Sequence, residues 1–486
     1  MASRVTQPLL WITVLLLAIL GYLTSDKVFI KRTNFVDSMG SGFGEASYLD
    51  FNDSIGTAWS LAHTVVADAD LVLLASPARV SKIQSFSLKN GKHRNCLADA
   101  QGIEEPFTER YQPRTSSFQL TSPIWGHVRR ASWEWGSGDI SREDFEAGMR
   151  NKHIIHYKLV GGRLFLNTSC SHHAVQKSTE EIIKFTLYMF PTLPDMEFLF
   201  YPGDDCNFGF ATIKFNYCRD PTKRGGFALP VFDVWDKSTG PTQMGFYHAC
   251  LDAQYPPHHR IPRVVWRGAS NNPFTVTGAD FYMSPRYRLH QLGLEHPDIL
   301  DAKLTSLRGD FLALPVEVVT ALNNTLGNHM TIEDFNRYCG ILDVDGNAWA
   351  GRFGHSFMHY PTPTIKMETQ YATFWDTLFA PGYTHLRFPS HMGTLVALSK
   401  KVIVDCISNG AKSHGQEIVA RMRKIARAYF DHVGIAEAMA YTLLTYRNLT
   451  TWRLDPSLEG FTEVKVPNCC EHVRLPQAVV DAMTMS

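Results

Sequence analysis

Apolar and polar residues follow recognisable periods along much of this chain. Two alternating runs flank Gly161-Gly162 within residues 153–167 and predict a β-hairpin, because adjacent glycines favour a tight turn. Residues 178–190 keep helical spacing behind a Ser-x-x-Glu capping box, and the apolar run 196–201 predicts a buried strand. A helix, a strand and a polar loop in this order form the unit of a doubly wound α/β sheet.

Similar units recur in the second half of the chain. VVWRGAS (264–270) and the apolar start of ILDVDGN (341–347) predict strands that end in polar loops, and residues 284–293 predict the start of a helix. Residues 371–379 are apolar at helical spacing and residues 415–433 are strongly amphipathic, which predicts further helices. The pattern as a whole predicts an α/β fold.

Composition and charge narrow the class of protein. The chain has 486 residues, enough for two or three domains of ordinary size, and 44% of them are hydrophobic, so a large core can form. Lysine plus arginine equals aspartate plus glutamate at 47 each. This balance gives no support to nucleic acid as a partner, which would favour a basic face.

The N-terminus carries an uncharged apolar run at residues 8–23, a little shorter than a comfortable membrane span of about 20 residues. Arg4 and Lys27 flank this run, which is either a cleaved signal peptide or an uncleaved signal anchor. Because no small-x-small cleavage site follows, we expect a single-pass type II anchor behind a cytoplasmic segment, residues 1–7. Residues 24–50 are then a stem, and the rest of the chain lies in a secretory lumen, Golgi rather than endoplasmic reticulum. A cleaved signal would make the protein secreted.

Glycosylation motifs and cysteines agree with a secretory lumen. Four Asn-x-Ser/Thr triplets are acceptors for N-glycans: Asn52, Asn167, Asn323 and Asn448. Nine cysteines are an odd number for an oxidising compartment, so at least one is free or intermolecular. Cys206 and Cys218 are spaced to close a short loop, and no Cys/His group has zinc-finger spacing.

The largest group of candidate ligand-binding residues lies in the polar loop that follows the predicted strand at Ile341. The acidic turn 343–347 is followed by Trp349 and Arg352. Ligands of open α/β sheets bind beyond the carboxyl ends of strands, and a guanidinium beside small residues suits a phosphate. A purely structural turn explains the Asp, Gly and Asn residues equally well. Calcium is excluded, because the position that requires a glutamate holds Gly354.

Other polar residues also lie at the ends of predicted elements. Arg267 ends a strand, and Arg286 lies at the start of a helix, where main-chain amides and a guanidinium together favour a diphosphate. Asp204 and Asp205 follow the strand at 196–201, and either one is a candidate general base or a solvated turn residue.

From residue 153 onward, four blocks of this sequence resemble glycosyltransferase family 90, which includes the capsule-associated xylosyltransferases of fungi and the protein O-glucosyltransferases of animals. The blocks are GGRLFLN with PDMEFLFYPGDD, VVWRGAS with SPRYRLHQLGLEHPDILDAKLT, ILDVDGNAWAGRF with SFMHYPTPTIKMETQYATFWDTLFAPGYTHLRF, and the helical end at 390–447. They follow the order and spacing of the family. Residues 1–150 contain no matching block.

The resemblance implies a GT-B fold: two Rossmann-like domains that face each other across a cleft, with C-terminal helices. The acceptor-side domain would span residues 51–255 and the nucleotide-sugar domain 256–450, followed by a tail at 451–486. It also implies inverting transfer of a sugar from a UDP-sugar to a hydroxyl of a protein or glycan acceptor, with no cofactor and no catalytic metal. Glucose or xylose is the expected sugar.

The resemblance also assigns residues. Asp204 would be the catalytic base, with Asp205 as a competitor. The UDP-sugar site would comprise Arg267, Ser270, Arg286, Asn347, Ala348, Trp349, Ala350, Gly351 and Arg352. The chain departs from the family where Arg337-Tyr338 replaces a usual Lys-Tyr and where Thr384-His385 replaces a usual His-Tyr.

Two other functions are weighed against transfer. A carbohydrate- or nucleotide-binding pseudoenzyme would keep the fold without activity. A glycoside hydrolase needs two carboxylates set across the scissile bond, but adjacent residues on a strand end, such as Asp204 and Asp205, diverge. We therefore expect a transferase.

Overall fold

The computed structural model describes residues 95–115, 140–150, 153–167, 173–203, 206, 214–220, 226–230, 234–235, 239–271, 283–376, 378–465 and 475–485. All of them belong to one compact unit, residues 71–486. The predicted anchor and stem, the Asn52 sequon and the Asp204-Asp205 pair lie outside the described residues. No helix among the described residues has both the length and the apolar character that a membrane crossing requires.

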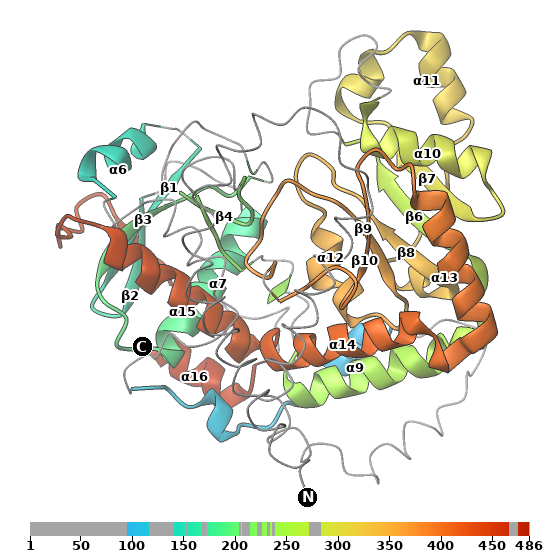
Figure 1. Cartoon of the computed structure of the whole chain (residues 1–486). Coiled ribbons are helices and arrows are strands. Elements are labelled where there is room, and N and C mark those ends of the chain that lie inside the picture. The colour runs from blue at the N-terminus through green and yellow to red at the C-terminus, as the bar shows by residue number, and fades with distance from the viewer. Residues whose placement is uncertain are drawn as a thin grey trace, which may run out of the picture. The chain divides into compact units, whose positions relative to one another are not determined.

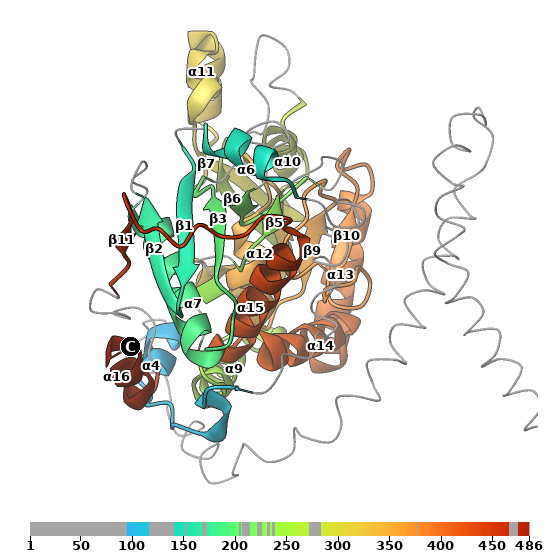
Figure 2. The same ribbon diagram turned by 90° about the vertical axis from the view of Figure 1, so that its left-hand side faces the viewer.

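The first sheet is mixed and has six strands in the order β11-β2-β1-β3-β4-β5. Its strands are β1 (Ile155–Val160), β2 (Arg163–Asn167), β3 (Met196–Phe200), β4 (Phe215–Asn216), β5 (Phe227–Ala228) and β11 (Thr462–Glu463). β1 and β2 form the predicted antiparallel hairpin. Gly161 and Gly162 have φ values of 56° and 74°, which a two-residue hairpin turn requires. Figure 2 shows β11, β2, β1 and β3 side by side in this order.

Two long helices, α7 (His173–Met189) and α15 (His432–Leu449), pack against each other beside this sheet (Figure 1). Their shared core contains stacked and edge-on rings, including Tyr446 against Phe215 at 5.0 Å between centroids. The helix predicted from residue 178 is confirmed, but it begins at His173. The capping-box sequence therefore lies inside the helix and does not start it.

The second sheet has five strands, all parallel, in the order β10-β9-β8-β6-β7. Its strands are β6 (Ile261–Ala269), β7 (Leu300–Ser306), β8 (Tyr338–Asp343), β9 (Thr364–Met367) and β10 (Leu386–Phe388). Neighbouring parallel strands require crossover connections, and α10 (Pro285–Glu295) and the short α12 (Gly351–His355) supply two of them. α11 (Val316–Asn323) and α13 (Leu395–Asn409) belong to the same region (Figure 1). The predicted α/β class is confirmed.

The remaining helices surround these sheets. They are α4 (Cys96–Gln101), α6 (Arg142–Met149), α9 (Pro241–Gln254), α14 (His414–Tyr429) and α16 (Gln477–Met485). The amphipathic helix predicted at 415–433 is confirmed as α14, but α14 ends earlier, at Tyr429, and residues 432 and 433 begin α15. The described residues of the segment 371–379 form no helix: Ala372 makes an isolated β-bridge, and residues 374–376 form a turn with Phe374 and Trp375 packed in the core.

Three disulfides join segments far apart in sequence or close a loop: Cys96–Cys250, Cys206–Cys218 and Cys339–Cys406. The second confirms the short loop suggested by the spacing. The other three of the nine cysteines, Cys170, Cys469 and Cys470, lie outside the described residues. Disulfides persist in oxidising compartments, so these bonds indicate a protein of the secretory pathway.

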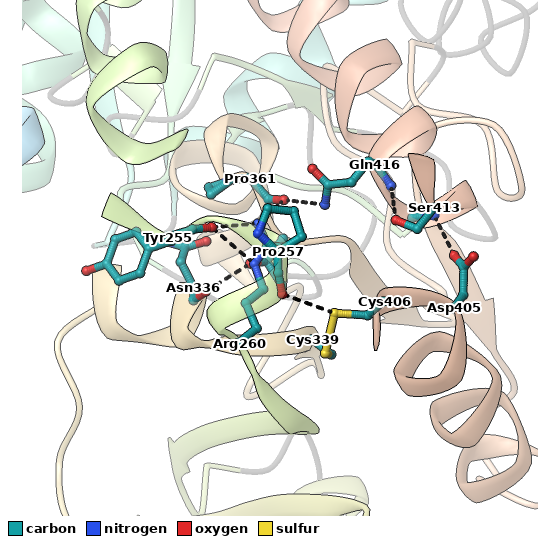
Figure 3. The surroundings of a disulfide bond; sticks show 12 residues. Tyr255, Pro257, Arg260, Asn336, Cys339, Pro361, Asp405, Cys406, Ser413 and Gln416 are labelled. Carbon is teal, nitrogen blue, oxygen red and sulfur yellow. Dashed lines mark hydrogen bonds between the residues drawn. A yellow bond between two sulfur atoms is a disulfide. The ribbon is translucent and has the colours of Figure 1, made fainter. Parts of the chain in front are cut away.

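Figure 3 shows how one disulfide braces the amino-terminal end of the parallel sheet. Cys339 on β8 is bonded to Cys406 on α13. Beside it, Arg260 donates hydrogen bonds to the carbonyl oxygens of Tyr255 and Pro361, and Gln416 of α14 donates to the same Pro361 oxygen. This end of the sheet is thus closed by covalent and main-chain contacts, while the opposite end carries the polar loops predicted from sequence.

Candidate functional site

Hydrogen bonds to Asp345 and within the main chain fix the conformation of the loop after β8. Asp345 is buried, and its Oδ1 accepts a hydrogen bond of 3.0 Å from the Ala350 amide, while the Gly346 amide donates to the Ala348 carbonyl at 2.9 Å. Burial raises the pKa of Asp345 above its usual range, partly offset by Lys366. The acidic segment 343–347 therefore forms a tight turn, and α12 follows it.

Arg286, the second residue of α10, joins this loop to β6. Its guanidinium donates to the carbonyl oxygens of Asp345 at 2.8 Å, Ala269 at 3.1 Å and Val344 at 3.2 Å. A Cβ on Gly346 would lie 2.7 Å from Nη2 of Arg286, so a larger residue here would displace the guanidinium from its present contacts. Burial, with Arg352 nearby, lowers the pKa of Arg286 to about 10, so the side chain remains positive at neutral pH.

Arg352 of α12 brings a second guanidinium to the same end of the sheet. Its Nη1 donates to the main-chain oxygen of Arg267 at 2.6 Å, and its guanidinium carbon lies 5.6 Å from the ring centroid of Phe335. Burial lowers the pKa of Arg352, and Asp343 opposes this shift. Two positive side chains therefore meet near the carboxyl ends of β6 and β8.

Arg267 and Ser270 take part through other contacts. The Arg267 guanidinium turns to Asp301 on β7, with Nη2 2.8 Å from Oδ1 and Nη1 2.6 Å from the carbonyl oxygen. Only the main chain of Arg267 meets Arg352. Ser270 is buried, and its Oγ accepts a hydrogen bond from the Arg308 amide at 2.8 Å. Both residues lie at the predicted strand end, with their side chains used to fix the neighbouring backbone.

The other loop residues differ in exposure. Asn347 is exposed, Trp349 is partly buried against the Trp375 ring at 5.0 Å, and Gly351 begins α12. Ala348 is buried in one apolar cluster with the Cys206–Cys218 disulfide. Cys206 directly follows the Asp204-Asp205 pair in sequence, so this cluster brings the loop after β8 to the segment that follows β3.

A buried ion pair at this end of the sheet was missed by the sequence reasoning. Lys366 Nζ lies 2.7 Å from Asp343 Oδ2, because these residues are register partners on β8 and β9. Burial disfavours the charged Lys366, yet Asp343 and Asp345 outweigh it and raise the lysine pKa. The sequence offers no signal for this pairing until the strand register is known.

The remaining predicted sites that the structure describes are three N-glycan acceptors, which are on the surface. The sequon asparagines Asn167, Asn323 and Asn448 are all exposed. Within the described part of the chain, no three His, Cys, Asp or Glu side chains gather in the way that a metal site requires. The site assembled at the sheet edge is thus a cationic one, with two guanidinium groups above a tight turn of small residues, suited to an anionic group such as a phosphate.

Comparison with known proteins agrees with this chemistry. The family model described as Glycosyl transferase family 90 matches residues 125–476, which is more than half of the chain. No curated protein matches the chain. The matched range includes the mixed sheet, the parallel sheet and the cationic edge described above. This chain belongs to glycosyl transferase family 90.

Proposed function

We propose that this protein transfers a sugar, glucose or xylose, from a UDP-sugar to a hydroxyl of a protein or glycan acceptor, with inversion and without a metal. The observation that carries the proposal is the pair of positively charged guanidinium groups at the carboxyl edge of a parallel sheet, those of the buried Arg286 and the partly buried Arg352. This is the edge at which open α/β sheets bind nucleotides. Family membership supports a sugar donor and an acceptor.

The proposed architecture is GT-B. Residues 51–255 would form the acceptor-side domain and residues 256–450 the nucleotide-sugar domain, with the parallel sheet in the latter. The three disulfides support a luminal location, and the apolar run at 8–23 would anchor the chain in a Golgi or endoplasmic reticulum membrane.

In the proposed reaction, the acceptor oxygen attacks the anomeric carbon on the face opposite UDP. The bond between the anomeric carbon and the diphosphate oxygen breaks, and its electron pair stays on that oxygen. Asp204 takes the proton from the acceptor hydroxyl as a general base. Negative charge grows on the diphosphate as the bond breaks, and fixed cations stabilise it more than they stabilise the bound donor.

We assign the two guanidinium groups different tasks. Arg286 donates three hydrogen bonds to carbonyl oxygens at the ends of β6 and β8. It therefore fixes the conformation of the loop after β8 and adds positive potential there. Arg352 is the second residue of α12, the short helix that follows the loop after β8. We propose that Arg352 contacts the diphosphate directly.

UDP release by the full-length protein in detergent, across a panel of UDP-sugars, tests the proposal. Wild type and Asp204→Asn are compared, and UDP binding is measured for both. Release with one sugar, lost in Asp204→Asn while UDP binding stays, is the expected result. Unchanged turnover in the variant would move the base to Asp205 or elsewhere, and absence of UDP binding in the wild type would overturn the donor site.

One observation favours a second function, binding without transfer. The side chains of Arg267, Arg286 and Arg352 all make internal hydrogen bonds, as they would in a site that has become structural. Measurable UDP affinity with no turnover of any donor, in the presence of a broad glycan and peptide acceptor panel, would support this pseudoenzyme.

A further inference from the structure

A main-chain bridge joins the mixed sheet to the parallel sheet. Arg219, shortly after β4, pairs antiparallel with Ala372, which follows β9. The Arg219 amide donates to the Ala372 carbonyl oxygen at 2.9 Å, and the Ala372 amide donates to the Arg219 carbonyl oxygen at 2.8 Å. Both residues are buried, so water does not compete for these two hydrogen bonds.

On the side of the mixed sheet, this bridge continues into a disulfide. Its first residue directly follows Cys218, and Cys218 is bonded to Cys206, the residue after the Asp204-Asp205 pair. Before that pair, the Tyr201 amide donates to the Phe215 carbonyl oxygen of β4 at 2.9 Å. The segment that carries the proposed base is therefore anchored on both sides, by a main-chain hydrogen bond and by a covalent bond.

On the side of the parallel sheet, the bridge continues to the loop after β8. Tyr371, next to the bridge, is buried in one apolar cluster with Ala348 of that loop and with the disulfide. The Tyr371 amide donates to Thr369 Oγ1 at 3.1 Å, and the Thr369 hydroxyl bonds to the carboxylate of Asp345. Asp345 is the residue that holds this loop. The disulfide is thus connected to the donor loop through a few packed and hydrogen-bonded residues.

We propose that the Cys206–Cys218 disulfide is a positioning element, which holds the base at a fixed place relative to the donor loop. The inference rests on the proposed function, in which Asp204 is the base and Arg352 contacts the diphosphate. These two residues follow strands of different sheets, yet transfer requires them on opposite sides of one anomeric carbon. A misplacement of about 1 Å in such a geometry costs about 100-fold in rate.

The double variant Cys206→Ala/Cys218→Ala tests this role in the full-length protein. We expect kcat with the UDP-sugar to fall about 10–100-fold, because the base is no longer held in place. KM for the UDP-sugar and the Kd of UDP should stay as in wild type, since Asp345 and Arg286 fix the donor loop without the disulfide. Weaker UDP binding with wild-type kcat would assign the bond to the donor loop alone and overturn the inference.

The double variant Cys339→Ala/Cys406→Ala is the matched control. It removes a disulfide at the opposite end of the parallel sheet, and this bond spans 67 residues of sequence, against 12 for Cys206–Cys218. Because longer closed loops stabilise more, the control should lose at least as much unfolding free energy. It should nevertheless keep wild-type kcat below its unfolding midpoint. The same kcat in both double variants would overturn the inference, since stability or neither bond would then control turnover.

A double-mutant cycle asks whether the disulfide acts through the base. Asp204→Glu keeps the carboxylate but displaces it by one methylene. This change should lower kcat strongly in the wild type and much less in Cys206→Ala/Cys218→Ala, where the position of the base is already lost. Equal fold losses with and without the disulfide would show that the bond does not act through Asp204, and the positioning role would fall.

Hydrogen exchange tests the connection without catalysis. The Ala372 amide and the amides of residues 345–350 should exchange faster in Cys206→Ala/Cys218→Ala than in wild type. Unchanged exchange there would overturn the connection whatever the activity. Faster exchange in a protein that never releases UDP would keep the connection while the proposed transfer fails.

Thr369→Val carries the test if the double variant does not fold. It breaks the same path but leaves both cysteines in place, and valine has nearly the shape of threonine. We expect a lower kcat with the Kd of UDP as in wild type. Wild-type kcat in Thr369→Val would overturn the inference.

Discussion

Arg260 and Arg286 lie at opposite ends of the same parallel sheet and make the same kind of contact. Each is buried, each donates to main-chain carbonyl oxygens, and burial lowers the pKa of each to about 10. Arg260 precedes β6 and ties Tyr255 to Pro361, whereas Arg286 ties the far ends of β6 and β8.

What surrounds these two arginines differs. The amino-terminal end has the Cys339–Cys406 disulfide close by (Figure 3). The carboxyl-terminal end has the tight turn held by Asp345. A second guanidinium lies near each arginine, but Arg423 near Arg260 is paired with Asp252 at 2.7 Å, whereas Arg352 near Arg286 donates to the Arg267 main-chain oxygen. In the proposed function, this difference in pairing makes the carboxyl-terminal end the one that holds an anion.

Arg352→Ala is the variant from which we expect the largest effect, because it removes the second guanidinium from the carboxyl-terminal end of the sheet. We expect turnover of the UDP-sugar to fall by about 10²–10³-fold, because the variant removes a preorganised cation from the leaving group. The unfolding midpoint should change little, since one hydrogen bond to the Arg267 carbonyl holds this side chain to its neighbour strand. UDP release and thermal unfolding are the measurements.

Arg260→Ala is the control for that experiment. It should lower the unfolding midpoint and leave the Kd of UDP as in wild type, because the amino-terminal end faces no ligand in the proposal. Wild-type turnover in Arg352→Ala would show that the diphosphate charge is stabilised elsewhere.

Lysine substitutions of Arg260 and Arg286 should have smaller effects and test whether the two ends of the sheet differ in ligand binding. Lysine keeps the charge but loses the planar fork, so Arg260→Lys and Arg286→Lys should each lower the free energy of unfolding by about 2–3 kcal/mol. Only Arg286→Lys should also weaken UDP binding, by about tenfold, because the loop after β8 loses its shape. Urea unfolding and UDP titration measure the two effects. Equal loss of UDP affinity in both variants would mean that global loosening, and not the site, controls binding.

Much of the local structure was predictable because it depends on neighbouring residues. The Gly161-Gly162 hairpin, the strand at 196–201 and the strand that precedes the acidic turn all follow from turn chemistry and from periodicity within a few positions. The arrival of Arg286 and Arg352 at one sheet edge follows from their placement at the ends of predicted elements, because parallel strands end together.

The remaining features depend on packing between distant residues. Residues 371–379 have helical spacing, yet Phe374 and Trp375 instead pack against Phe430 of a distant segment, and turns result. The direction of the Arg267 side chain depends on Asp301, a partner on the adjacent strand. The Asp343–Lys366 pair requires the strand register, which periodicity does not supply.

The smallest expected effect is a pH dependence of stability that arises from two buried histidines. His385, which directly precedes β10, has a pKa lowered to about 3, and His248 on α9 has one lowered well below its usual range, in both cases mainly through burial. In the unfolded chain each ring takes up a proton near pH 6.5, while the folded His385 stays neutral until about pH 3. The unfolded state thus binds more protons between these values, and stability falls as pH falls.

For His385 this linkage amounts to roughly 2 kcal/mol lost between pH 7 and pH 5. Urea unfolding at both pH values should show a smaller loss in His385→Gln than in wild type, and His248→Gln tests the other histidine in the same way. If His385→Gln keeps the full wild-type pH dependence while His248→Gln reduces it, the acid sensitivity comes from His248. His385 would then titrate normally in the folded protein, and a positive charge would appear beside Lys366 and Arg387 below neutral pH.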